Sequence, residues 1–122
     1  MLNRIVARWR GTRTASLLFW AAALFALLMA LLPHPPEVPG NPSDKVQHML
    51  AFAVLGVLGW LAYPRRRILF LIAALSLFGA AIEVLQAIPA LHRDSDPLDW
   101  LADTVACALV LVVLHWLGAR KR

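Results

Sequence analysis

The sequence predicts an all-α fold, an integral membrane four-helix bundle with both ends of the chain in the cytoplasm (N-in/C-in). The 122 residues are 61% hydrophobic, whereas soluble domains are roughly half apolar. The hydrophobic residues are concentrated in four stretches, each close to the length of about 20 residues that crosses a bilayer. Short clusters of arginine and lysine stand between these stretches. The length of the chain is that of a single domain.

The four apolar stretches are the expected membrane spans, at about residues 15–32, 46–63, 68–88 and 98–117. Prolines and glycines stand between them, which favours turns over continuing helices. Arginines precede the first stretch as they precede a signal peptide, but this stretch is longer than the apolar core of a signal peptide and no small-residue cleavage site follows it. We therefore expect it to remain as a span. A membrane domain at 15–117 then lies between a basic N-tail at 1–14 and a basic C-tail at 118–122.

The distribution of charge predicts the orientation of the spans. Ten of the twelve basic residues lie in the two tails and in the connection between the second and third spans. Only Lys45 and Arg93 lie on the other side, where all seven acidic residues also fall. Because lysine and arginine accumulate in cytoplasmic segments, we expect both tails in the cytoplasm. Apolar residues between Leu2 and Trp9 repeat at helical spacing, so a short helix on the membrane surface is expected there.

The net charge of +5 does not indicate a nucleic-acid binder, because the basic clusters stand at the ends of spans and form no continuous basic face. The single cysteine, Cys107, lies inside an apolar stretch, so no intramolecular disulfide can form and we expect a packing role. The sequence contains no phosphate-binding glycine loop, zinc motif or nucleophile elbow.

Polar side chains gather where three spans reach the expected outer face. We call this group the polar cluster, and its members are Asp44, Lys45, His48, Glu83, Gln86, Arg93, Asp99 and Asp103. At 1.5 Å per helical residue, Glu83 and Asp103 lie roughly 8 to 9 Å inside the ends of their helices and share a depth. An ionisable group at such a depth is costly, and it normally faces the bundle interior, a cavity or a partner. These two acids are the strongest candidates for a functional role.

Other members of the polar cluster also have structural interpretations. Asp44 can cap the helix that it begins, and the neighbouring Asp96 can do the same for the fourth span. Lys45 and Arg93 can extend toward the interface with water. His48 alone would more often be an interfacial histidine than a ligand. The two deep acids fit none of these roles.

Asp99 and Asp103 lie four residues apart on one helix face, where like charges repel. A basic neighbour such as Arg93 or Lys45, a bound cation, or protonation of one carboxyl would relieve the repulsion. A divalent cation is therefore the candidate cofactor, although its identity stays open. Its candidate ligands are Glu83, Asp99, Asp103 and His48, which offer carboxylate oxygens and an imidazole nitrogen.

The order of these motifs resembles the VanZ-like family of small bacterial membrane proteins. The residues that carry the resemblance are Asp44-Lys45-x-x-His48, Glu83-x-x-Gln86, Arg93 and Asp99-x-x-x-Asp103, and it runs from Asp44 to about Val110. The combination is fairly specific, whereas each motif alone is weak. Asp103 stands where the family often has asparagine, so the family pattern admits a neutral amide there. Ala106 stands where a glycine usually follows, which suggests looser packing of the fourth span.

The resemblance implies a multi-pass protein of the bacterial cytoplasmic (inner) membrane. The named member of the family is associated with resistance to the glycopeptide antibiotic teicoplanin. The implied partners are therefore membrane lipids, together with a lipid-linked envelope precursor or an envelope-active drug. The favoured function is action on such molecules at the outer face of the membrane, through the polar cluster.

Two other functions stay open. The first is a metal-assisted enzyme acting on a lipid headgroup, in which the ion would polarise a phosphoryl oxygen. No nucleophile–base pair is visible, so the catalytic residues, and whether the protein is an enzyme, are unknown. The second is an oligomeric proton-coupled transporter with Glu83 as the titrating carboxylate. Polar residues at only one end of the bundle argue against it, and the oligomeric state also stays open.

Overall fold

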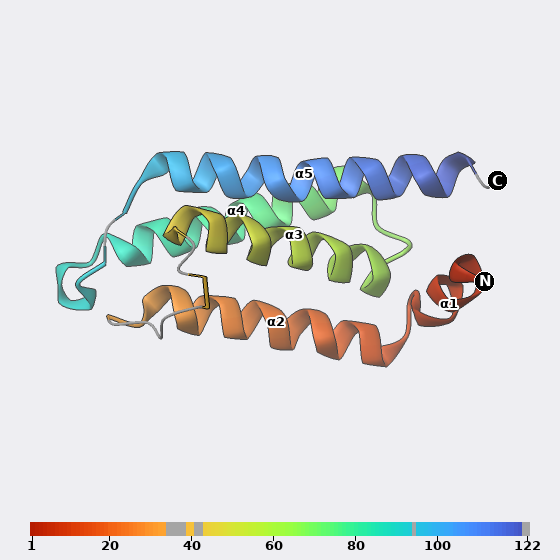
Figure 1. Cartoon of the computed structure of the whole chain (residues 1–122), viewed down its shortest axis with the longest axis horizontal. Coiled ribbons are helices and arrows are strands. Elements are labelled where there is room, and N and C mark those ends of the chain that lie inside the picture. The colour runs from red at the N-terminus through yellow and green to blue at the C-terminus, as the bar shows by residue number, and fades with distance from the viewer. Residues whose placement is uncertain (34–38, 41–42, 94, 121–122) are drawn as a thin grey trace.

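The computed structural model describes residues 1–33, 39–40, 43–93 and 95–120. Within these ranges the chain is all-helical, which confirms the predicted fold class. The elements in order are α1 (Leu2–Trp9), α2 (Arg13–Leu31), α3 (Asp44–Ala62), α4 (Ile68–Gln86), the 3-10 helix η1 (Pro89–Leu91) and α5 (Pro97–Arg120). Figure 1 shows α2, α3, α4 and α5 running along one another, with α1 as a short separate helix beside the start of α2.

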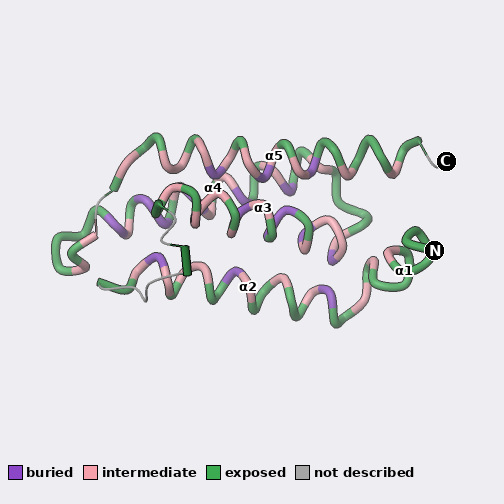
Figure 2. Tube along the Cα trace, viewed as in Figure 1, coloured by how far each residue is buried: buried purple, intermediate pink, exposed green. Residues whose placement is uncertain are grey.

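The four long helices are each long and apolar enough to cross a membrane, so the chain is a multi-pass membrane protein. Helices α2, α3 and α4 have 19 residues and α5 has 24, and 19 residues span about 28 Å, close to the thickness of the hydrocarbon layer. Large apolar side chains stay exposed on the outside of the bundle. On α4 these include Leu69, Leu77 and Val84, which are each at least 70% exposed. Figure 2 shows this pattern, with buried segments facing the inside of the bundle.

Hydroxyl and carboxylate side chains fix where the helices begin. The Thr12 hydroxyl accepts a hydrogen bond from the Ala15 amide at 3.1 Å at the start of α2. At the start of α3, the Ser43 hydroxyl accepts one from the Val46 amide at 3.2 Å. Ser43 therefore caps α3, which leaves the Asp44 carboxylate for other contacts. Asp96 caps α5 as expected, since its Oδ1 accepts from the Leu98 amide at 2.9 Å.

Helices α3 and α4 each contact the three other long helices, and the most extensive packing is between α3 and α5. Gly56 of α3 lies against α5, where an added Cβ would lie 3.5 Å from the Cys107 carbonyl oxygen, an ordinary van der Waals distance. Gly79 of α4 makes room for the ring of Phe52, whose Cζ would lie 3.3 Å from an added Cβ. Cys107 is free and completely buried, in agreement with the packing role expected for it.

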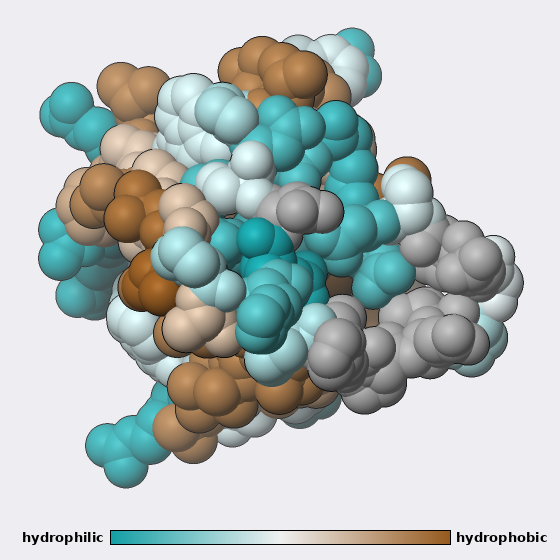
Figure 3. Space-filling view, turned by 90° about the vertical axis from the view of Figure 1, so that its left-hand side faces the viewer, coloured by the Kyte–Doolittle hydropathy of each residue, from teal (hydrophilic) through white to brown (hydrophobic). Residues whose placement is uncertain are grey.

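The two ends of the bundle differ in charge. Both termini and the α3–α4 connection with Arg65, Arg66 and Arg67 lie at one end (Figure 1). At this end the Arg10 guanidinium lies over the Trp60 ring, 3.8 Å from its centroid. Figure 3 looks onto the opposite end, where hydrophilic residues gather over the middle and hydrophobic residues lie beside them. The acidic residues Glu37 and Asp94, expected in the connections at that end, lie outside the described residues.

Candidate functional site

The polar cluster is assembled where the start of α3, the end of α4 and the start of α5 meet. Its members come from segments far apart in the sequence, and ion pairs join them across the helices. The contacts divide the cluster into outer pairs, which use the two bases, and an inner group of buried side chains.

The outer pairs neutralise two of the acids. Arg93 Nη2 lies 3.3 Å from Asp44 Oδ2, and Arg93 Nη1 donates to the Leu32 carbonyl oxygen at 3.0 Å. The Arg93 side chain is only 8% exposed and does not extend into water. It connects the segment before α5 to the residue after α2 and to the first residue of α3. Lys45 Nζ lies 3.4 Å from Asp99 Oδ1 and joins α3 to α5. Lys45 is thus the basic neighbour that relieves the repulsion between the two acids of α5.

The inner group consists of His48, Glu83 and Asp103, which we call the buried triad because both acids are buried; the His48 side chain is 12% exposed. Each comes from a different helix, α3, α4 or α5. Asp103 is 2% exposed and Glu83 is 7% exposed. His48 Nδ1 lies 3.7 Å from Asp103 Oδ2, and one ligand atom from each of the three residues lies within 4.8 Å of the others. Asp99, the fourth ligand candidate from the sequence, pairs with Lys45 outside this group.

Glu83 also positions the segment that leads into α5. Its Oε2 accepts a hydrogen bond from the Asp96 amide at 3.0 Å. The Ser95 hydroxyl lies 3.2 Å from the same oxygen and 2.9 Å from the Glu83 carbonyl oxygen, so its one proton is shared between them. The other carboxylate oxygen, Oε1, is buried and has no hydrogen-bond partner among the described residues. Glu83 therefore holds the segment before α5 through Oε2, while Oε1 is left without a partner in the described part of the chain.

Gln86 faces a different helix from the buried triad. Its Nε2 donates to the Ala30 carbonyl oxygen at 2.9 Å, and the residue is 1% exposed. Ala30 lies in the last turn of α2, where backbone carbonyls lack partners within the helix. Gln86 thus joins the end of α4 to the end of α2. Its spacing from Glu83 indicated a polar role but could not indicate this partner.

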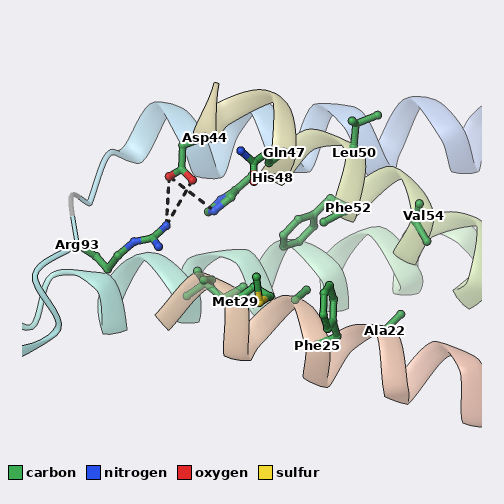
Figure 4. A pocket seen from close by; sticks show the side chains of 14 residues that line it. Ala22, Phe25, Met29, Asp44, Gln47, His48, Leu50, Phe52, Val54 and Arg93 are labelled. Atoms are coloured by element: carbon green, nitrogen blue, oxygen red, sulfur yellow. Dashed lines mark hydrogen bonds and ion pairs between the residues drawn. The ribbon is translucent and has the colours of Figure 1, made fainter. Parts of the chain in front are cut away.

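A pocket of about 370 Å³ opens between α2 and α3 beside the cluster. Apolar side chains line most of it, among them Phe25 and Met29 of α2 and Phe52 of α3. Its polar lining comes from one end only, where Asp44, Gln47, His48 and Arg93 stand. Figure 4 shows Asp44, His48 and Arg93 grouped at that end, with the aromatic and aliphatic side chains further along the two helices.

Sequence reasoning missed this pocket, and the one sequence pattern that lines it is ambiguous. Ala22, Ala26 and Ala30 recur every fourth residue on α2, and all three line the pocket. A row of small residues along one face of a membrane helix normally allows close helix contact. Here the row packs partly against the core and also lines the groove beside α3.

The site therefore combines a polar end, a buried triad with unused oxygens, and an apolar groove that reaches from it along the membrane helices. Such an arrangement can hold a polar headgroup and an acyl chain together, and the triad offers ligands to a cation.

Comparisons of the chain with protein-family models, with curated proteins and with solved structures found no match.

Proposed function

We propose that the protein binds an amphiphilic molecule of the bacterial cell envelope, with the apolar chain in the pocket between α2 and α3 and the headgroup at the polar cluster. The observation that carries this proposal is the lining of the pocket, which is apolar along two membrane helices and polar at one end. Binding pockets for small molecules commonly pair an apolar lining with a few polar groups that fix orientation. The candidates are membrane lipids, lipid-linked sugars and envelope-active drugs such as glycopeptides.

The proposal places the polar cluster at the outer face of the bacterial cytoplasmic membrane. The basic residues of the other end favour the cytoplasm for both termini. The resemblance to the VanZ-like family supports the same membrane and a role in the handling of envelope lipids or envelope-active drugs.

Labelling of introduced cysteines tests this orientation. We expect Ala90→Cys, in η1 and exposed, to react with a membrane-impermeant maleimide in intact cells. Arg66→Cys, in the exposed α3–α4 connection, should react only after the cells are permeabilised. The wild-type protein, whose only cysteine is buried, supplies the background. Labelling of residue 66 in intact cells would place the polar cluster on the cytoplasmic side and contradict the proposed orientation.

A pocket-filling substitution tests the binding function. Ala26 lines the pocket on α2, whereas Ala21 on the same helix is exposed and lies outside it. Ala26→Trp should lower the amount of co-purified amphiphile by roughly tenfold, the change that about 1.4 kcal/mol of lost binding produces. Ala21→Trp should leave that amount unchanged. The measurement is mass spectrometry of solvent extracts from equal amounts of protein, and equal extracts from both variants would contradict the proposal.

The location of the buried charges favours binding over proton transport. Among the described residues, the buried polar side chains are Glu83, Gln86 and Asp103, all at the polar-cluster end. Further along the bundle the core consists of apolar side chains such as Leu55, Leu75 and Leu111. A transport path would need polar groups or water across this region.

A further inference from the structure

The ion pairs of the polar cluster leave two buried acids without a base. Arg93 pairs with Asp44, and Lys45 pairs with Asp99. In the described part of the chain, neither Glu83 nor Asp103 forms an ion pair with a lysine or an arginine. Among the described residues, the basic side chain grouped with these two acids is His48, whose Nδ1 lies 3.7 Å from Asp103 Oδ2. Two carboxylates at this depth need a compensating positive charge, because burial of an unpaired charge is costly.

Two oxygens of these acids also lack hydrogen-bond partners. Glu83 Oε1 and Asp103 Oδ1 are both buried, and no described residue donates a hydrogen bond to either. Buried polar atoms in folded proteins almost always have a partner. The two residues come from different helices and belong to one group whose ligand atoms lie within 4.8 Å of one another. Two carboxylates on different helices therefore lie close together, and each has one buried oxygen free to bind a shared ligand.

From these observations we infer that His48, Glu83 and Asp103 bind a divalent transition-metal ion, Zn²⁺ or Mn²⁺. With a neutral imidazole, two carboxylates balance the charge of a divalent ion and leave a neutral site. This inference does not depend on the proposed amphiphile, since the triad would bind an ion with the pocket empty.

The geometry of the triad suits such an ion. In a tetrahedral site with bonds of about 2.0–2.2 Å, the ligand atoms lie about 3.3–3.6 Å apart. His48 Nδ1 and Asp103 Oδ2 already lie 3.7 Å apart, and the widest separation in the group is below 4.8 Å. Small side-chain rotations on three packed helices would close the remaining gap. Three protein ligands leave a fourth position for water or another ligand, and His48 also lines the polar end of the pocket.

The donor set favours a transition metal over Mg²⁺ or Ca²⁺. Imidazole suits Zn²⁺ and other transition metals, whereas carboxylates alone also suit Mg²⁺, Ca²⁺ and Mn²⁺. One imidazole with two carboxylates therefore favours a divalent transition metal, and Zn²⁺ and Mn²⁺ are the ions used to test the site.

Glu83→Gln is the sharpest variant for this site. The Asp96 amide and the Ser95 hydroxyl both donate toward Oε2, so the glutamine carbonyl is expected to take that position and preserve the segment before α5. The glutamine NH₂ group then occupies the position of Oε1, where it cannot bind a cation. Asp99→Asn is the matched control, because it also removes one negative charge from the cluster but at a residue paired with Lys45.

The experiment measures metal content and thermal unfolding of the detergent-purified full chain. After chelation, the wild type should bind about one Zn²⁺ or Mn²⁺ per chain by elemental analysis, with an increase in Tm of about 5 °C or more at saturation. MgCl₂ should give a much smaller increase. Glu83→Gln should weaken metal binding at least tenfold, and Asp99→Asn should bind like the wild type.

His48→Ala provides a second test in case Glu83→Gln fails to fold, which helicity and size-exclusion profiles would show. It removes the imidazole and should weaken Zn²⁺ binding at least tenfold. The inference is overturned if the wild type binds neither ZnCl₂ nor MnCl₂ stoichiometrically. It is also overturned if Asp99→Asn weakens binding as much as the triad variants do, because binding would then follow the net charge of the cluster.

Discussion

Glu83→Gln is expected to abolish function while the protein still inserts and accumulates in the membrane. The substitution keeps an acceptor for the Asp96 amide and the Ser95 hydroxyl, which hold the start of α5. It removes the carboxylate charge and replaces the unpaired oxygen Oε1 by a donor. We therefore expect the fold to be preserved, while the polar cluster loses one negative charge and the unpaired carboxylate oxygen. In a deletion strain, we expect complementation of an envelope-stress or drug-sensitivity phenotype to fall to the level of the empty vector.

Asp103→Asn is the comparison for this experiment. An asparagine keeps one carbonyl oxygen at a position where the VanZ-like pattern admits an amide, so most of the function should remain. Membrane abundance of both variants is measured on immunoblots beside the phenotype. Full complementation by Glu83→Gln would show that residue 83 acts only in packing and hydrogen bonding, and the functional site drawn around it would be wrong.

Phe52→Ala should produce the largest loss of stability among single substitutions in the core. Phe52 is 2% exposed, packs against Gly79 and lies 5.9 Å from the ring of Phe78, centroid to centroid. Truncation of a buried phenylalanine typically costs about 3 to 5 kcal/mol, because a cavity is left behind. The free energy of unfolding, measured by titration with a denaturing detergent, should fall by about that amount.

Phe70→Ala supplies the matched control on α4. The Phe70 side chain is 52% exposed on the outside of the bundle, where its ring lies under the Arg66 guanidinium at 4.9 Å. An exposed contact of this kind contributes about 0.5 to 1 kcal/mol, so the loss of stability should be small. Equal losses in the two variants would mean that Phe52 is not part of a packed core between α3 and α4.

Most of the fold could be predicted from the sequence, because the lipid bilayer permits few backbone structures. Apolar stretches of bilayer length separated by prolines leave little choice except membrane helices. The four long helices lie close to the expected spans. The polar cluster could also be predicted as a group, since charges this deep in apolar helices must share an interior position.

The pairing within the cluster could not be predicted in the same way. Lys45 and Arg93 both fitted the interpretation of side chains that extend to the interface, but each joins a specific acid of another segment. Gln86 donates to a backbone carbonyl of α2, 56 residues away. Such contacts depend on how the helices cross, and local spacing does not specify the crossing. The pocket follows from the same crossing, because the alanine row of α2 could equally have packed against α3.

The lipid content of the purified wild-type protein tests the central claim most directly. The protein would be extracted in a mild detergent, washed extensively and examined by native mass spectrometry, followed by identification of whatever dissociates from it. We predict that each protein molecule retains one tightly bound amphiphile after washing. This is expected for a molecule whose apolar tail lies in the pocket between α2 and α3. A wild-type protein that carries only exchangeable lipid, in the same amount as Ala26→Trp, would contradict the proposed function.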